Sequence, residues 1–167
     1  MPEEQASAEI VTAGQAALTT LAMPMQECYC TLLFYVVNKD GRWLCGHIGD
    51  GYIFRVRQNT STVFSAPENG RTTSETYFFS EPDAASHLRI RSGFLLESYA
   101  VLLTSDGGGD TLFDLQLQQP APAVEQLCDW LTENDETEVT DALKRLLQGR
   151  MVPATEDDVS VAILCFS

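Results

Sequence analysis

Apolar and polar positions alternate along the first half of the chain in the manner of short β-strands. Residues 28–37 form an aromatic and β-branched run, and residues 42–48 form a second apolar run after the turn residues 38–41. Residues 52–57 then alternate apolar positions with wetter ones, as a strand with one exposed face does. This succession predicts two consecutive hairpins and therefore an antiparallel sheet.

The central and final parts of the chain predict further strands. Residues 77–80, 87–91 and 99–104 are strand candidates, whereas the polar stretch 59–76 predicts a loop or flap. The closing run, residues 159–166, is almost entirely apolar. A strand of this kind is most easily buried in the middle of a sheet, so we expect a central position for it.

Helices are expected at both ends of this strand-rich region. Residues 3–22 are rich in Ala, Gln and Leu and are closed by Pro24, and two later segments carry apolar residues at helical spacing, with Gly149 as the expected stop of the second. The apolar positions are Val124, Leu127, Cys128 and Leu131 in the first segment and Val139, Leu143, Leu146 and Leu147 in the second. The pattern predicts an α/β (α+β) sandwich of antiparallel β-sheets flanked by helices.

Composition narrows the class of protein. The chain has 167 residues, 44% of them hydrophobic, which predicts a single domain over residues 1–167. Its 24 acidic and 10 basic side chains give a net charge of -14, which disfavours nucleic acid and anionic membranes as partners. We find neither a secretion signal nor an apolar run of the roughly 18 residues that a membrane span needs. A cytoplasmic location is expected.

The cysteines and histidines add little chemistry. The five cysteines form no C-x-x-C pair, and Cys30, Cys45 and Cys165 lie within apolar runs, which predicts reduced core thiols. A zinc site built from Cys28, Cys30 and His47 is an open alternative. A single histidine within a strand is nevertheless more commonly packed or exposed than catalytic.

Three short motifs place aspartates beside apolar runs. They are Gly-Asp-Gly at 49–51, Ser-Asp-Gly at 105–107 with a further Asp at 110, and Asp-Asp at 157–158. One such turn alone usually has a purely conformational role. Together they predict one carboxylate site: two carboxylates about 5 Å apart repel by about 3 kcal/mol at an effective dielectric of roughly 20, so a cluster normally holds a cation. Oxygen ligands alone favour Mg²⁺ or Mn²⁺.

The order of these motifs resembles that of the metal-dependent type 2C protein serine/threonine phosphatases, the PPM family, in its compact bacterial branch. The family's Gly-Asp strand end is matched at 47–51, its Thr/Ser-Asp-Gly strand end at 102–107, and its closing Asp-Asn strand at 157–163. Residues 67–70 and 75–78 are similar to its flap segment. The resemblance extends over about residues 29–166.

The resemblance implies a role for each aspartate. Asp106 and Asp157 are implied as ligands of the catalytic metal pair, while Asp50 and Asp110, with Asp106, correspond to an additional metal site. Residues expected beside the ligands rather than on the metal are Asp158, Gly51 and Gly107. The implied reaction uses Mn²⁺ or Mg²⁺ to activate a water that attacks phosphoserine or phosphothreonine in a phosphoprotein, so no catalytic protein nucleophile is expected.

Other features of the family have no match in the sequence. They are an Arg that contacts phosphate, a Glu-Asp pair, and an Asp-Gly strand end whose Asp bridges both metals, so the chain resembles a family member without its first strands. We therefore expect a weak two-metal site and impaired turnover by this chain alone, with a non-catalytic, pseudophosphatase-like binding module as the alternative. Uncovered sheet edges would favour a homodimer or a strand-swapped oligomer. A purely structural domain is a third interpretation.

Overall fold

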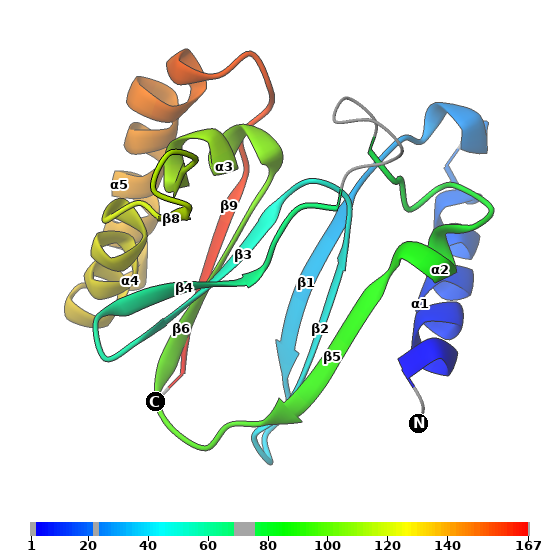
Figure 1. Ribbon diagram of the computed structural model, residues 1–167, viewed down its shortest axis with the longest axis horizontal. Helices are drawn as coiled ribbons and strands as arrows, with labels where there is room; N and C mark the ends of the chain where they lie inside the picture. Colours follow the sequence, from blue (N-terminus) through cyan, green and yellow to red (C-terminus); the bar gives the residue numbers. More distant parts are fainter. Residues whose placement is uncertain (1–2, 22–23, 69–75, 167) are drawn as a thin grey trace. The chain divides into compact units, whose positions relative to one another are not determined.

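The contacts within the chain group it into two compact units (Figure 1). Unit 1 consists of Met1–Asp50 and Glu68–Leu96, and unit 2 consists of Gly51–Pro67 and Glu97–Ser167. The computed structural model describes residues 3–21, 24–68 and 76–166. The single-domain organisation expected from the length of the chain stays a prediction.

Unit 1 contains a three-stranded antiparallel sheet in the order β1-β2-β5 (Figure 1). Its strands are β1 (Leu32–Val37), β2 (Arg42–Ile48) and β5 (Arg89–Phe94), and its helices are α1 (Glu3–Leu18), η1 (Met25–Glu27) and α2 (Ala84–His87). The predicted first hairpin is confirmed, because β1 pairs with β2. The Asn38 side chain fixes its turn by accepting hydrogen bonds from the N–H groups of Asp40 and Arg42, at 3.0 and 2.9 Å.

Helix α1 and the sheet of unit 1 share one hydrophobic cluster. Its buried members are Ala6, Val11, Ile48, Phe79, Ala84, Leu88 and Ile90. The hydroxyl of Ser7, itself buried, donates a hydrogen bond to the Leu88 carbonyl over 3.0 Å and ties the helix to the segment before β5. The helix ends at Leu18, four residues before the predicted end.

Unit 2 contains a four-stranded antiparallel sheet in the order β4-β3-β6-β9, with helices packed against it (Figure 1). Its strands are β3 (Tyr52–Arg57), β4 (Thr60–Ser65), β6 (Tyr99–Thr104) and β9 (Val161–Phe166), with a short hairpin of β7 (Phe113–Asp114) and β8 (Gln119–Pro120). Its helices are α3 (Asp106–Leu112), α4 (Ala123–Glu133), α5 (Glu136–Leu146), η2 (Leu147–Met151) and η3 (Val152–Ala154). The two predicted amphipathic helices correspond to α4 and α5.

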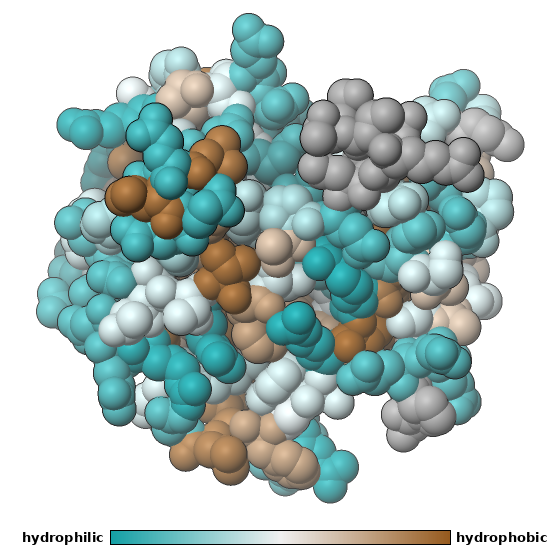
Figure 2. All heavy atoms as spheres, viewed as in Figure 1, coloured by the Kyte–Doolittle hydropathy of each residue, from teal (hydrophilic) through white to brown (hydrophobic). Residues whose placement is uncertain are grey.

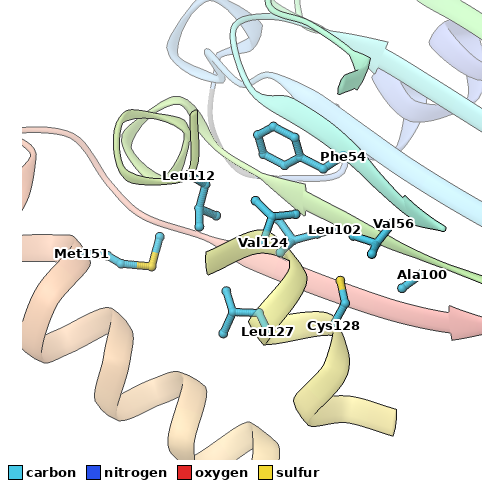
Figure 3. Packing of buried hydrophobic residues seen from close by; sticks show 9 residues of the cluster. All are labelled: Phe54, Val56, Ala100, Leu102, Leu112, Val124, Leu127, Cys128 and Met151. Atoms are coloured by element: carbon cyan, nitrogen blue, oxygen red, sulfur yellow. The ribbon is translucent and has the colours of Figure 1, made fainter. Parts of the chain in front are cut away.

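The core of unit 2 lies between its sheet and α4. Figure 3 shows Phe54 from β3 and Leu102 from β6, near Val124, Leu127 and Cys128 of α4. Each of these five residues is at most 2% exposed. Burying such apolar side chains is the main favourable term in folding, so this cluster fixes the β3–β6 pair against α4.

The β7–β8 turn of unit 2 exposes two leucines. Leu115 and Leu117 are 68% and 65% exposed, and Figure 2 shows hydrophobic residues on the surface at the place where this turn lies. The Asp114 carboxylate holds the turn by accepting hydrogen bonds from the N–H groups of Gln116 and Leu117, at 2.8 and 2.9 Å. The conformation of the turn is therefore set by polar contacts rather than by burial.

Two predictions about the strands are wrong. The second hairpin does not form, because β2 and β3 belong to different sheets and β3 pairs instead with β4 and β6. Strand β4 lies within the predicted loop 59–76, while residues 77–80 form no strand. The sequence did not predict β4 because this segment is polar. Its stability depends on pairing with β3 and on contacts with the distant helix α4 rather than on its own composition. Residues 69–75 of the predicted flap lie outside the described residues.

Two further features of unit 2 differ from the prediction: the end of α5 and the position of β9 in its sheet. Gly149 does not stop α5, because the chain continues through it as the helical turn η2 and so carries Met151, 4% exposed, into the core. The last strand, β9, is not central: within the described part of the chain it pairs only with β6 and forms an edge of its sheet. No helix among the described residues is long and apolar enough to cross a membrane.

Candidate metal centre

Asp106 and Asp110 lie on one short helix of unit 2. Helix α3 begins at Asp106, directly after β6 and Ser105, and ends at Leu112. Residues four apart on a helix lie on the same face, so Asp106 and Asp110 share a face of α3. Asp110 is exposed, while Asp106 is half-buried.

Ser105 joins the start of α3 to the segment that holds Asp157 and Asp158. Its hydroxyl donates to the Asp158 carbonyl over 2.8 Å and accepts a hydrogen bond from the Ser160 N–H over 3.0 Å. Thr104 adds a third link, because its hydroxyl donates to the Ser160 carbonyl over 2.9 Å. Segments more than fifty residues apart in sequence are thus held side by side.

Gly107 permits this close approach. A Cβ atom at this position would lie 2.9 Å from the Asp158 carbonyl oxygen and 3.1 Å from that of Asp157. Both distances are shorter than ordinary carbon–oxygen contacts, so a side chain would push α3 away from this segment. The expected role of Gly107 beside the ligands is thus a matter of space.

Thr155 connects Asp110 to Asp157 and was not singled out by the sequence. Its hydroxyl donates to the Asp110 carboxylate over 3.0 Å and accepts a hydrogen bond from the Asp157 N–H over 3.2 Å. A Thr two residues before an Asp is a local signal for such a turn, because the hydroxyl accepts from the N–H two residues on. Its bond to Asp110 depends on tertiary structure and has no local signal.

Tyr52 forms the apolar border of this site. Its ring lies against Gly109, where a Cβ would be 2.6 Å from a ring carbon, and it stacks on Phe113 at 5.0 Å between ring centroids. Burial, with a smaller contribution from the nearby Asp110 carboxylate, raises the pKa of the Tyr52 phenol. Tyr52 therefore stays protonated beside the acidic helix.

Asp50 belongs to unit 1, where it is bound by its own neighbours. Its carboxylate accepts a hydrogen bond from the Thr76 hydroxyl. Gly49 before it adopts a φ of +109°, a conformation that other residues rarely take, and its carbonyl accepts a hydrogen bond from the Glu68 N–H over 3.0 Å. Gly51 after it is the first residue of unit 2.

A polar network lies next to the Asp50 turn. The Arg89 guanidinium contacts Nδ1 of His47 over 3.0 Å and pairs with the Glu68 carboxylate over 3.0 Å. His47 is 1% exposed; this burial, assisted by the positive charge of Arg89, lowers its pKa to about 3. His47 is therefore neutral at pH 7 and packed within the sheet, which is one of the two non-catalytic positions that the sequence left open.

The donor chemistry of the predicted site suits a hard divalent cation. The backbone carbonyl oxygens of Asp157 and Asp158 lie against Gly107 of α3, the helix that carries Asp106 and Asp110. Carboxylate and carbonyl oxygens are the ligands that Mg²⁺ and Mn²⁺ prefer. Among the described residues, no three His, Cys, Asp or Glu side chains are arranged to hold a metal ion. The zinc alternative of Cys28, Cys30 and His47 accordingly finds no support in this part of the chain.

Comparison with known proteins places these features in context. A family model described as protein phosphatase 2C matches residues 2–148. A search of curated proteins gives no significant match. Among solved structures, PppA, a key regulatory component of T6SS in Pseudomonas aeruginosa, is 18% identical, with a TM-score of 0.54 over 98% of this chain and 67% of that one.

Two further solved structures agree in fold. The phosphatase domain of the cell fate determinant SpoIIE from Bacillus subtilis is 15% identical, with a TM-score of 0.51 over 98% of this chain and 73% of that one. The catalytic domain of the serine/threonine protein phosphatase PstP, in complex with 2 manganese ions, is 17% identical, with a TM-score of 0.54 over 81% of this chain and 57% of that one. The mixed α/β fold with antiparallel sheets matches these phosphatase folds, which confirms the predicted fold class.

Proposed function

Because this chain belongs to the protein phosphatase 2C family, we propose that it is a metal-dependent protein phosphatase domain acting on phosphoserine and phosphothreonine. One observation carries the proposal: Ser105 binds the start of α3 to the Asp158 segment, so that both aspartate motifs of unit 2 lie together. A domain that uses no cation has little reason to hold these acidic segments against one another.

Asp106, Asp110 and Asp157 of unit 2 are the residues that we propose as ligands of Mn²⁺ or Mg²⁺. The ligand role of Asp50, which belongs to unit 1, stays a prediction from the sequence. Such a cation supplies an activated water and offsets the charge of phosphate oxygens. Thr155 holds the Asp110 carboxylate and the Asp157 backbone, and Ser105 holds the Asp158 carbonyl, so these hydroxyls orient the ligand segments. Asp158 and Gly107 form their surroundings.

We propose that turnover is weak in this chain alone. The described residues present no convergent set of three His, Cys, Asp or Glu side chains, which supports low metal affinity. The same observation favours a second candidate function, a non-catalytic, pseudophosphatase-like module that binds a phosphoprotein without hydrolysing it. Metal affinity and hydrolysis separate the two functions.

The proposed setting of this function is the bacterial cytoplasm, with a phosphoprotein as the substrate or partner. The five cysteines are free thiols, as a reducing compartment favours. The net charge of -14 supports the further proposal that nucleic acid and anionic membranes are not partners. Self-association of the chain completes the proposal, because a sheet with unpaired edges tends to acquire a neighbour.

The test measures hydrolysis of p-nitrophenyl phosphate and of a phosphothreonine peptide with Mn²⁺, together with Mn²⁺ affinity by titration calorimetry. We expect weak, Mn²⁺-dependent hydrolysis that Asp106→Asn abolishes. Asp141→Asn on the exposed face of α5 removes the same charge away from the site and should leave both readouts unchanged.

Each result has a defined meaning. Mn²⁺ binding without hydrolysis, lost in Asp106→Asn, would support the binding module. Absence of both would contradict a metal site in this chain, and equal effects of Asp106→Asn and Asp141→Asn would contradict the assignment of Asp106.

A further inference from the structure

Strand β9 is an apolar strand at the edge of its sheet. All six of its residues, Val-Ala-Ile-Leu-Cys-Phe, are apolar, yet none of them is buried, and Ala162 is exposed. Within the described part of the chain its backbone pairs with β6 on one side only. The unpaired side presents N–H and C=O groups that another strand can bind.

The two faces of β9 are both apolar. Val161, Ile163 and Cys165 pack against the core cluster of unit 2, and by the alternation of a strand Ala162 and Leu164 face the other way. A strand that is apolar on both faces is typical of the middle of a sheet. The sequence of β9 is therefore typical of a central strand, although the strand lies at the edge of its sheet. A further strand paired with β9 would give it a central position.

The opposite edge of the same sheet is protected. Strand β4 has a polar sequence, Thr-Ser-Thr-Val-Phe-Ser. Its Ser61 N–H and hydroxyl both donate to the Glu125 carboxylate of α4, each over 2.8 Å. A carboxylate that accepts a hydrogen bond from the backbone of an edge strand satisfies that backbone group and disfavours pairing with another chain. The described residues place no such group on β9.

Unit 1 has an apolar edge strand as well, but a better covered one. In β1, Tyr35 is only 7% exposed and stacks on Trp43 with the ring centroids 5.6 Å apart. The carbonyl of Cys30, just before β1, accepts a hydrogen bond from the Phe79 N–H over 2.7 Å. Strand β9, by contrast, has no buried residue.

We propose that β9 pairs with β9 of a second copy of this chain, in antiparallel orientation. Such a pair is self-complementary: a two-fold axis sets each strand against itself and joins the two four-stranded sheets into one. The proposal names the surface of the self-association proposed above. It does not depend on hydrolysis.

Charge favours the antiparallel orientation of this pair over the parallel one. The net charge of -14 on each chain opposes association in general, but β9 itself carries no charged side chain, so contact along this strand adds no repulsion of its own. Residues 156–158, Glu-Asp-Asp, precede β9. Antiparallel pairing places the two acidic segments at opposite ends, roughly 20 Å apart at about 3.4 Å per residue, well beyond the Debye length of about 8 Å at physiological salt. Parallel pairing would place them side by side.

The experiment measures molar mass by light scattering over a dilution series, with no metal or substrate. We expect a dimer whose dissociation constant rises roughly tenfold or more in Ala162→Lys, because a lysine on an edge strand opposes pairing. Thr62→Lys on β4 and Val36→Lys on β1 are matched controls at exposed edge positions and should leave the dimer intact. Circular dichroism checks that each variant is folded.

Amide hydrogen exchange provides a measurement that needs no variant. Exchange of β9 amides should slow as the wild-type chain is concentrated, while exchange in β4 stays unchanged. A monomer at all concentrations would overturn both this proposal and the proposed self-association. A dimer weakened by Val36→Lys rather than by Ala162→Lys would overturn only the assignment to β9.

The orientation has its own test. Glu156→Gln removes one charge from each acidic segment, and in the antiparallel dimer its effect on the dissociation constant should be small. A large strengthening of the dimer by Glu156→Gln would overturn the antiparallel orientation.

Discussion

The two units differ on the sheet face that lies away from their helix-packed cores. In unit 2, this face of β3 and β6 carries Ile53, Val101 and Leu103, which are at most 7% exposed. In unit 1, the equivalent face of β2 and β5 carries His47 and Arg89. On this face unit 2 buries three apolar side chains, although Arg55 and Arg57 of β3 share the face and Arg57 pairs with Glu97. Unit 1 instead buries a histidine beside an arginine, and the contribution of this pair to stability changes with pH.

The largest expected effect tests the dependence of unit 2 on packing. Phe54 is 0% exposed and stacks on Tyr52 at 5.4 Å between ring centroids, so Phe54→Ala should leave a cavity in the core. We expect a loss of about 3–5 kcal/mol in the free energy of unfolding, measured by denaturant titration. Phe94→Ala at a 58% exposed position is the matched control and should cost well under half as much. Equal losses of unfolding free energy in Phe54→Ala and Phe94→Ala would contradict the dependence of unit 2 on its buried core.

The second effect tests the pH dependence of unit 1. The pKa of His47 is about 3 in the folded chain and about 6.5 when unfolded, so between these values the unfolded chain binds a proton that the folded chain does not. The stability that this difference provides is complete above about pH 6.5 and is lost as the pH falls toward 3. The loss should be at most roughly 5 kcal/mol.

His47→Gln isolates this contribution. The variant should lose less stability than wild type between pH 7 and pH 4, measured by denaturant titration at each pH, because glutamine does not titrate. His87→Gln is the control, since His87 is half-buried on α2 and pairs with Asp83 over 3.5 Å. An unchanged pH dependence in His47→Gln would contradict a buried neutral histidine.

The third effect concerns Arg89, which connects His47 to Glu68. Arg89→Met keeps much of the length of the side chain but removes both polar contacts, so we expect a loss of about 1–3 kcal/mol in the free energy of unfolding. Because the charge of Arg89 helps to lower the pKa of His47, the variant should also lose less stability on acidification. Lys39→Met, at an exposed turn position of the same unit, should change neither quantity. Similar losses in both variants would show that the effect comes from removing a positive charge and not from the contacts of Arg89.

The sequence predicted the strands whose local pattern and tertiary environment agree. Strands β2 and β6 begin and end where they were expected, because their apolar runs are bounded by turn residues. Strand β4 was missed because its polar sequence resembles a loop, and its edge is satisfied by Glu125, 64 residues away from Ser61. Helix α3 was missed because Gly107, Gly108 and Gly109 are poor helix formers.

The candidate site likewise combines residues that have a local sequence signal with contacts that have none. The aspartates could be singled out because their motifs are local and ordered along the chain, and the family match covers the motifs at Asp50 and Asp106. Their role as metal ligands stays a prediction. The roles of Ser105 and Thr155 could not be predicted, because each acts on a partner about fifty residues away. The edge position of β9 was also inaccessible, since composition reports how apolar a strand is and not which strands lie beside it.

The smallest expected effect concerns Thr155, whose hydroxyl is a polar link between the acidic segments of unit 2. Thr155→Val removes the hydroxyl that binds Asp110 and the Asp157 N–H, and a single partly exposed link is worth about 1 kcal/mol, or up to roughly tenfold in Mn²⁺ affinity. Titration calorimetry should show weaker Mn²⁺ binding in Thr155→Val, while Thr155→Ser, which keeps the hydroxyl, should bind as wild type does. The free energy of unfolding should fall by no more than about 1 kcal/mol in Thr155→Val and stay unchanged in Thr155→Ser, because Thr155 lies outside the core cluster. If wild type, Thr155→Val and Thr155→Ser all bind Mn²⁺ equally, the link does not orient the ligands, and the polar contacts of unit 2 would then serve only to hold α3 in place.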